Sequence, residues 1–154
     1  MKELFKYYEG DLNVFIAESL ITKDLLIKRI ISLVSDTLIS DLKEKGVVID
    51  NTFKHTLDNN AIRHVIKVHG SSNELLRGQI PITDSDLLLI PEIVSSYDKI
   101  TVDKNSRKQD VIIYTKTMKD GISFFVEEIR KGRHELAASS MYKRKKGDSP
   151  TLID

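Results

Sequence analysis

The sequence contains no cysteine. This excludes disulfides, thiolate nucleophiles and cysteine-ligated zinc, and it fits the reducing cytoplasm or a protein that is delivered across membranes. Long apolar runs are also missing: residues 30–35 form a short one that ends at Asp36, so we expect no transmembrane helix. The N-terminus alternates charged and aromatic residues and predicts no signal peptide, so a cytoplasmic location is expected. Without a glycine-rich phosphate loop or a dinucleotide fingerprint, nothing supports an NTPase or a Rossmann-type enzyme.

What the sequence does contain is typical of a soluble folded domain with unevenly distributed charge. Hydrophobic residues make up 40% and charged residues 31% of the 154 positions, enough apolar material to bury a core. Residues 1–100 hold twelve Lys and Arg against fifteen Asp and Glu (net −3), and residues 101–154 hold twelve against eight (net +4). Between Arg130 and Lys146 the one acid is Glu135. This cluster indicates a polyanionic partner, and a solvated charged tail is the alternative.

Apolar residues at helical spacing predict that residues 1–46 are helical. We expect a short helix over residues 11–20 and a longer one over residues 23–45, which Thr22 would cap and Gly46 would end. The longer helix would carry a broad apolar stripe made of Leu26, Ile27, Ile30, Ile31, Val34, Leu38 and Leu42. Either the rest of the chain or a second copy has to cover this stripe, so residues 22–45 are a candidate homodimer interface.

Three further helical segments and then four strands are predicted downstream. Asp58 or Asn59 would cap a helix with two histidines, a second segment covers residues 73–78, and a third begins at Thr83 or Asp84. Residues 99–104, 110–117, 122–130 and 134–142 alternate like strands and are joined by short polar segments, as in antiparallel neighbours. The predicted fold class is α+β: N-terminal helices, then a four-stranded antiparallel β-meander with the helices packed on one sheet face. We divide the chain into a helical arm or linker (1–46), a central domain (47–146) and a flexible tail (147–154).

Three histidines within fifteen residues are the first candidates for acid–base chemistry. Histidine is the side chain whose ordinary pKa lies nearest neutrality. On a helical wheel His64 falls at the margin of the apolar sector and His69 inside it, while His55 precedes the helix and could fold back towards them. The alternative for His69 is a structural role, in which its ring donates a hydrogen bond to the backbone carbonyls at the end of the helix. Ligating carboxylates at tight spacing are missing, so the histidines predict no metal site, and no cofactor is expected.

Two adjacent carboxylates, Glu127 and Glu128, lie in a predicted strand, where neighbouring side chains point to opposite faces. One of them must therefore point towards the helices, where a carboxylate needs a partner. The arginines available for this role are Arg63, Arg77, Arg130 and Arg133. The buried carboxylate is either part of a structural ion pair, or a general base or a group that orients a catalytic cation.

The last predicted strands offer groups that suit a phosphate. Alternation places Ser140 and Tyr142 on one face of the final strand and Lys143 on the other. The two hydroxyls could hold a phosphate together. Lys116, on a neighbouring strand, could stabilise a phosphorane, although a lone strand lysine is more often simply solvated.

The order of these residues resembles the phage-associated barnase–EndoU–colicin–RelE-like (BECR) nuclease domains, which are often found at the C-terminus of phage head-morphogenesis (MuF-type) and polyvalent proteins. The resemblance covers roughly residues 50–146 and leaves out residues 1–46. It rests on His55-Thr56-Leu57-Asp58, Arg63-His64, His69-Gly70, Arg77-Gly78-Gln79-Ile80-Pro81, Glu127-Glu128-Ile129-Arg130-Lys131-Gly132-Arg133 and Met141-Tyr142-Lys143.

The resemblance implies a metal-independent endoribonuclease, a toxin or effector that cleaves tRNA or another structured RNA. The 2′-hydroxyl would attack the neighbouring phosphate and leave a 2′,3′-cyclic phosphate and a 5′-hydroxyl. The expected partners are RNA and an immunity or antitoxin protein. The alternative is a non-catalytic module that binds nucleic acid or protein on the same scaffold. The implied catalytic residues are His64, His69, His55, Arg133 and Tyr142, and the implied phosphate-binding residues are Arg130, Lys116, Ser140, Lys143 and Arg144.

Overall fold

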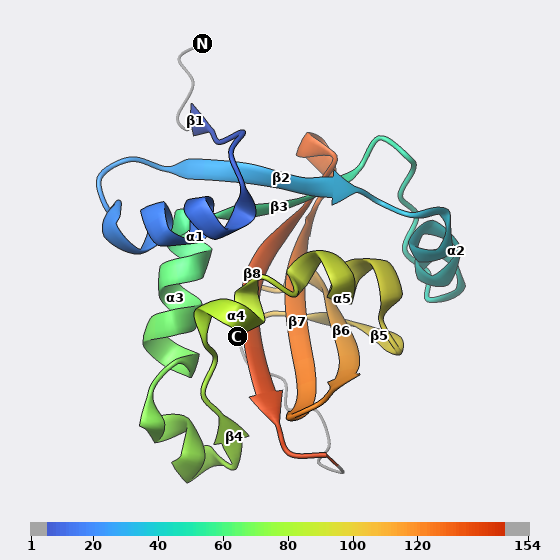
Figure 1. Ribbon diagram of the computed structural model, residues 1–154. Helices are drawn as coiled ribbons and strands as arrows, with labels where there is room; N and C mark the ends of the chain where they lie inside the picture. Colours follow the sequence, from blue (N-terminus) through green and yellow to red (C-terminus); the bar gives the residue numbers. More distant parts are fainter. Residues whose placement is uncertain (1–5, 147–154) are drawn as a thin grey trace.

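An eight-stranded mixed sheet organises the chain, with helices on one face and along one edge (Figure 1). The computed structural model describes residues 6–146. The strands are β1 (Lys6–Tyr7), β2 (Ile27–Leu33), β3 (Lys54–Asp58), β4 (Gln79–Ile80), β5 (Lys99–Lys104), β6 (Asp110–Met118), β7 (Gly121–Arg130) and β8 (Glu135–Arg144). Their order is β1-β2-β3-β8-β7-β6-β5, and β4 pairs with β8. The β1–β2 and β3–β8 pairs are parallel and the others are antiparallel.

The fold class is α+β as predicted, but a four-stranded antiparallel meander does not describe this sheet. Strands β5 to β8 do pair antiparallel in chain order. However, β8 also pairs in parallel with β3, where Lys54 lies opposite Glu135, and the sheet continues through β2 to β1. A parallel pair between segments so far apart leaves no local signal, because its strands are not joined by a turn.

The predicted helix over residues 23–45 is wrong. Helix α1 (Leu12–Ile21) ends at Thr22, and β2 and then α2 (Asp36–Glu44) occupy the segment, with Ser35 capping α2 by accepting from the Leu38 amide (3.1 Å). The isoleucines of residues 27–31 are β-branched, which favours a strand. The strand pairs with β3 from Lys28 to Leu33, with a shift in register between Ile30 and Ser32. Ile27 and Leu38, members of the stripe proposed as a dimer surface, are buried in the chain's own core.

Residues 1–46 therefore do not form a purely helical arm, because β2 lies in the same sheet as the strands of the C-terminal half. Helix α1 packs against α3 (Asn59–His69), which runs beside β8. The predicted tail, residues 147–154, lies outside the described residues. Within residues 6–146, no helix has the length and apolar character needed to cross a membrane.

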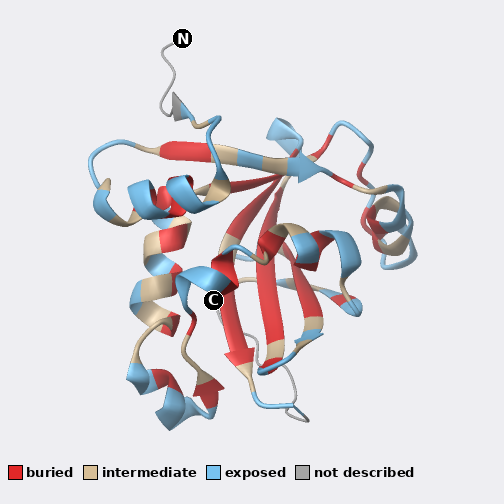
Figure 2. Ribbon diagram, viewed as in Figure 1, coloured by how far each residue is buried: buried red, intermediate tan, exposed pale blue. Residues whose placement is uncertain are grey.

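Helices α4 (Asp84–Leu87) and α5 (Ile90–Ser96) cover one face of strands β6 to β8, which are deeply buried (Figures 1 and 2). Ile90 and Ile93 of α5 pack there with Phe125 and Met141 of the sheet. Each fully buried side chain of this kind contributes about 1.5–3 kcal/mol. A second apolar cluster on the opposite face has strand residues as its buried members: Val111, Ile113, Phe124, Val126 and Tyr142.

A β-bulge in β8 decides which residues share that second face. Val126 pairs with Ser140 but the next residue, Glu127, pairs with Ala138, so one extra residue of β8 is inserted between these pairs. Ala138 therefore points towards the helices with Glu127, while Ser140 and Tyr142 point to the opposite face. The sequence alternation alone would place Ala138 and Tyr142 on the same face.

Candidate active site

Two of the predicted histidines meet Tyr142 near the C-terminal end of β8. Helix α3 begins at Asp58, whose carboxylate accepts from the Ala61 amide (2.8 Å), and it carries His64 and His69. The rings of His64 and His69 lie 6.4 Å apart between centroids, and those of His69 and Tyr142 lie 6.0 Å apart. His64 is exposed, whereas His69 and Tyr142 are buried. Three of the five predicted catalytic residues thus come together from two elements.

A buried carboxylate orients His69. The 3₁₀ helix η1 (Ser72–Arg77) places Glu74 so that its Oε2 lies 3.0 Å from His69 Nδ1, and both side chains are fully buried. Because a carboxylate only accepts hydrogen bonds, Nδ1 carries a proton and Nε2 is left as the second ring atom for proton exchange. Arg77 Nη1 lies 3.2 Å from Glu74 Oε1. Glu74 was not among the predicted site residues, although its spacing of three residues from Arg77 is a recognisable ion-pair signal.

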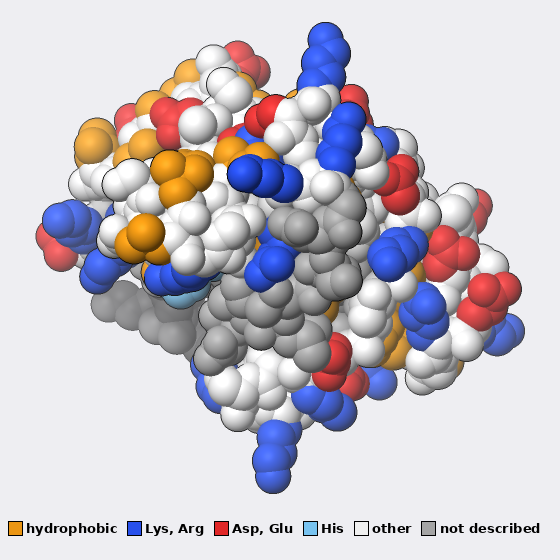
Figure 3. Space-filling view, turned by 90° about the horizontal axis from the view of Figure 1, so that it is seen from below, with side chains coloured by type: hydrophobic (Ala, Val, Ile, Leu, Met, Phe, Trp, Pro, Cys, Tyr) orange, Lys and Arg blue, Asp and Glu red, His pale blue; other side chains and the backbone are white. Residues whose placement is uncertain are grey.

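Cationic side chains surround this end of β8. Arg144, two residues beyond Tyr142 on the same face, is half-buried, and Lys145 and Lys146 are exposed. Figure 3, which views the molecule from below, shows Lys and Arg side chains scattered over this face among acidic and uncharged ones, and a small histidine surface beside one of the cationic groups. A polyanion approaching from this side would meet positive charge first.

His55 does not join the other histidines. It lies on β3, buried, with Nδ1 2.8 Å from Glu127 Oε2, and the Tyr114 hydroxyl donates to Glu127 Oε1 (2.6 Å). Burial and the neighbouring Glu127 raise the pKa of Tyr114 well above its ordinary value, so this hydroxyl stays protonated as a donor. Glu127 is the carboxylate that faces the helices, but its partners are a histidine and a tyrosine instead of an arginine.

Arg130 and Arg133 lie at the opposite end of the β7–β8 hairpin. Arg130 is paired with Glu128 (3.0 Å) and Glu135 (3.4 Å), and Glu135 is also paired with the buried Lys28 (2.9 Å). Arg133 is exposed in the short 3₁₀ segment η2 (Lys131–Arg133). At ~3.3 Å per residue, these arginines are about 20 Å along the strands from Tyr142. The fold therefore does not bring them to the histidines.

The two lysines predicted to bind phosphate, Lys116 and Lys143, form hydrogen bonds with other groups of the protein. Lys116 Nζ donates to the Ser96 carbonyl (2.7 Å), on the helix-covered side. Lys143 is buried and donates to Asp86 Oδ1 (2.8 Å) and Asp120 Oδ2 (2.6 Å), joining α4 to the turn between β6 and β7. Burial by itself would lower the pKa of Lys143, but its hydrogen bonds to the two aspartates outweigh burial and raise it. The bond to Lys143 lowers the pKa of Asp120.

We expect Lys143→Met to lower the free energy of unfolding at pH 7 by about 2 kcal/mol, less than for a fully enclosed pair because Asp120 is exposed to solvent. The pKa of Asp120 is depressed on folding, so its contribution is present above its unfolded pKa of about 3.8 and is lost as the pH falls through the folded value. The raised pKa of Lys143 keeps its contribution until the pH rises above about 10.5.

Urea unfolding at pH 7 and at pH 3 measures this effect, with Lys145→Met as the matched control on an exposed lysine. The difference between wild type and Lys143→Met should shrink at pH 3, whereas Lys145→Met should match wild type at both. An equal difference at both pH values would contradict the ion pair.

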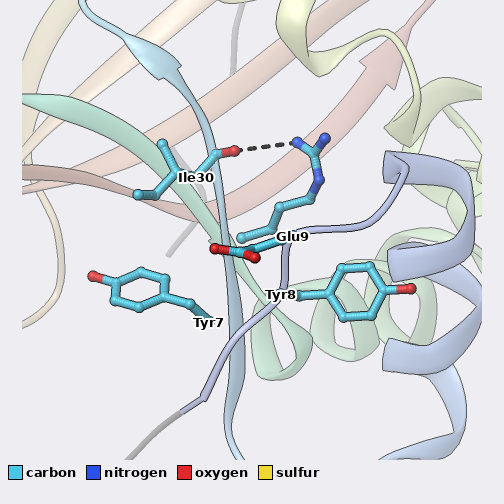
Figure 4. A pocket seen from close by; sticks show the side chains of 5 residues that line it. Tyr7, Tyr8, Glu9 and Ile30 are labelled. Carbon is cyan, nitrogen blue, oxygen red and sulfur yellow. Dashed lines mark hydrogen bonds between the residues drawn. The ribbon is translucent and has the colours of Figure 1, made fainter.

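A hollow of about 300 Å³ lies at the β1–β2 edge, away from His64 and His69, and is lined by Tyr7, Tyr8, Glu9, Arg29 and Ile30 (Figure 4). Arg29 Nε donates to the Gly10 carbonyl (2.9 Å) and Nη1 to the Ile30 carbonyl (3.1 Å). Its cation is thus already committed to backbone groups, and no histidine lines the hollow. Across residues 6–146, no three His, Cys, Asp or Glu side chains gather in a way that could hold a metal ion.

Comparison with known proteins agrees with the resemblance found in the sequence. A family described as phage-Barnase-EndoU-ColicinE5/D-RelE like nuclease3 matches residues 32–149, which include α3, η1 and β8. No curated protein matches the chain, and no solved structure matches it. The match covers well over half of the 154 residues and contains every predicted site residue, so the chain belongs to the phage-Barnase-EndoU-ColicinE5/D-RelE like nuclease3 family.

Proposed function

We propose that this nuclease-family domain is a metal-independent endoribonuclease that cleaves RNA at the site of His64, His69 and Tyr142. The observation that supports the proposal is the meeting of these three side chains at the end of β8, beside Arg144. A 2′-hydroxyl transesterification uses one group to accept a proton and one to donate it, and two imidazoles can fill these roles. We extend the proposal to a toxin or effector that acts in the cytoplasm on tRNA or another structured RNA and has an immunity protein as partner.

Each residue has a role in this mechanism. His64, the exposed histidine, accepts the proton of the 2′-hydroxyl as its oxygen attacks the phosphorus. His69, held by Glu74 through Nδ1, donates a proton from Nε2 to the departing 5′-oxygen. The Tyr142 hydroxyl and Arg144 stabilise the charge of the phosphorane. Because His69 and Tyr142 are buried, the site has to open at His64 and Arg144, the members that reach the surface.

The test is incubation of the purified protein with tRNA, rRNA and mRNA in EDTA, followed by mapping of the fragment ends. We expect fragments with a 2′,3′-cyclic phosphate and a 5′-hydroxyl. A matched oligonucleotide with one 2′-deoxy residue at the cleaved position should stay intact, because the attacking hydroxyl is missing. RNA that survives micromolar protein for hours, while binding as well as its deoxy analogue, would instead indicate a binding module.

A further inference from the structure

Several buried polar atoms around Tyr142 have no hydrogen-bond partner. Within the described residues this holds for His69 Nε2, Gln79 Oε1, Ser140 Oγ and Arg144 Nε. Buried polar groups in folded proteins are nearly always hydrogen-bonded, and each exception asks for an explanation such as a role in catalysis or in binding an ion. Other buried atoms without a hydrogen-bond partner are Ser19 Oγ, Glu74 Oε1, Thr115 Oγ1 and Ser123 Oγ, but near Tyr142 four such atoms occur together.

The strand register places Gln79, Ser140 and Arg144 on one face of the sheet. Ser140, Tyr142 and Arg144 alternate along β8 and share the face opposite the helices. Gln79 of β4 lies directly opposite Arg144 in an antiparallel pair, so its side chain points to the same face. His69 reaches this group from the end of α3, where its ring contacts Tyr142.

The unpartnered atoms differ in what they can bind. The Nε–H of Arg144 donates, and the Ser140 hydroxyl can donate, so both suit the oxygens of an anion. Gln79 Oε1 only accepts, so it repels a phosphate oxygen and needs an N–H or O–H group. A ligand that satisfies all of them therefore combines an anion with hydrogen-bond donors, and a nucleotide, with its phosphate and its nucleobase edge, has this composition.

We propose that Gln79, Ser140 and Arg144 form a nucleotide subsite in which Arg144 and Ser140 hold a phosphate and Gln79 discriminates between nucleobases. The inference rests on the proposed function, since the subsite lies against His69 and Tyr142 and would hold a nucleotide next to the cleaved bond. Gln79 is then a specificity-determining residue and takes no part in proton transfer. A site built to hydrogen-bond a ligand group discriminates strongly, because a ligand without that group leaves the buried amide unpaired.

The experiment titrates the isotope-labelled protein with the four ribonucleoside 3′-monophosphates and with inorganic phosphate, in EDTA, and follows the spectrum by NMR. We expect shifts at the Gln79 side-chain amide, His69 and Tyr142, and at least tenfold tighter binding of the best nucleotide than of phosphate. Gln79→Met should bring all four nucleotides close to the affinity of phosphate, whereas Arg144→Lys should weaken nucleotides and phosphate together. The melting temperature of Gln79→Met should stay level or rise, because the substitution removes a buried amide oxygen that has no hydrogen-bond partner.

The matched control is Gln109→Met, an exposed glutamine in the turn before β6, which should bind nucleotides like wild type. The subsite is wrong if nucleotides bind no tighter than phosphate, or if Gln79→Met retains wild-type affinities. Binding is measured without cleavage, so the two proposals fail separately. RNA that is cut without nucleotide binding at Gln79 overturns the subsite alone, and nucleotide binding with intact RNA overturns the ribonuclease alone.

Discussion

Replacing His64 with alanine should lower kcat/KM for RNA cleavage by about 10²–10⁴-fold, the usual contribution of a general acid or base. The fold should survive, because His64 is exposed and substitutions at exposed positions normally change stability by less than about 0.5 kcal/mol. Initial rates on a short defined RNA, together with urea unfolding of the same preparation, measure both effects. The loss should appear mainly in kcat, since His64 acts on the reacting hydroxyl.

The matched control is His134→Asn, at the other end of the hairpin. His134 is exposed and has a left-handed backbone (φ +52°), which asparagine tolerates well. This variant should cleave RNA like wild type. If both variants lost the same amount of kcat/KM, the effect of the exposed imidazoles would be one of charge and not of proton transfer. If His64→Ala kept the wild-type rate of RNA cleavage, His64 would have no role in the mechanism.

His55→Leu should have the largest effect on stability, lowering the free energy of unfolding by about 3–5 kcal/mol. The substitution leaves Glu127, which is fully buried, with the Tyr114 hydroxyl but without its histidine. A buried carboxylate that loses a partner keeps its desolvation penalty without the compensating interaction. Urea unfolding at pH 7 measures the change.

A triple substitution separates the loss of the pair from the loss of volume. In His55→Leu/Glu127→Leu/Tyr114→Phe the whole polar group is replaced by apolar side chains of similar size, and most of the stability should return. If His55→Leu kept wild-type stability but abolished RNA cleavage, His55 would be catalytic and the structural role given to it here would be wrong.

Helix α3 shows how much of the candidate site can be predicted from the sequence. A cap at Asp58 or Asn59 and the apolar periodicity predict α3 with His64 and His69 on it, and the structure has that helix, with Asp58 as its cap. The contact between His69 and Tyr142 depends on α3 packing beside β8, and Glu74 enters through the 3₁₀ turn that follows. Neither contact has a sequence pattern of its own, because both join separate elements.

The segment of residues 23–45 shows the opposite case. Its apolar residues fit a helical stripe, but β2 gains ladder hydrogen bonds from β3 that an isolated segment cannot have. Secondary-structure preference is a weak prior, and tertiary pairing overrides it here. Strand pairing also decides the bulge in β8, which places Ser140 and Tyr142 on the face away from the helices, whereas sequence alternation alone would put them on the same face as Ala138.

By itself, the sequence determined the α+β class, the resemblance to phage BECR nucleases, the helix with two histidines and the strands of the C-terminal half. These features depend on caps, turns and periodicity within a few residues, which a sequence displays directly. Only the tertiary structure decided that His55 is buried with Glu127, that Arg133 stands far from Tyr142, and that Lys143 belongs to an aspartate pair. Those outcomes follow from strand order and register, which bring together residues distant in the chain.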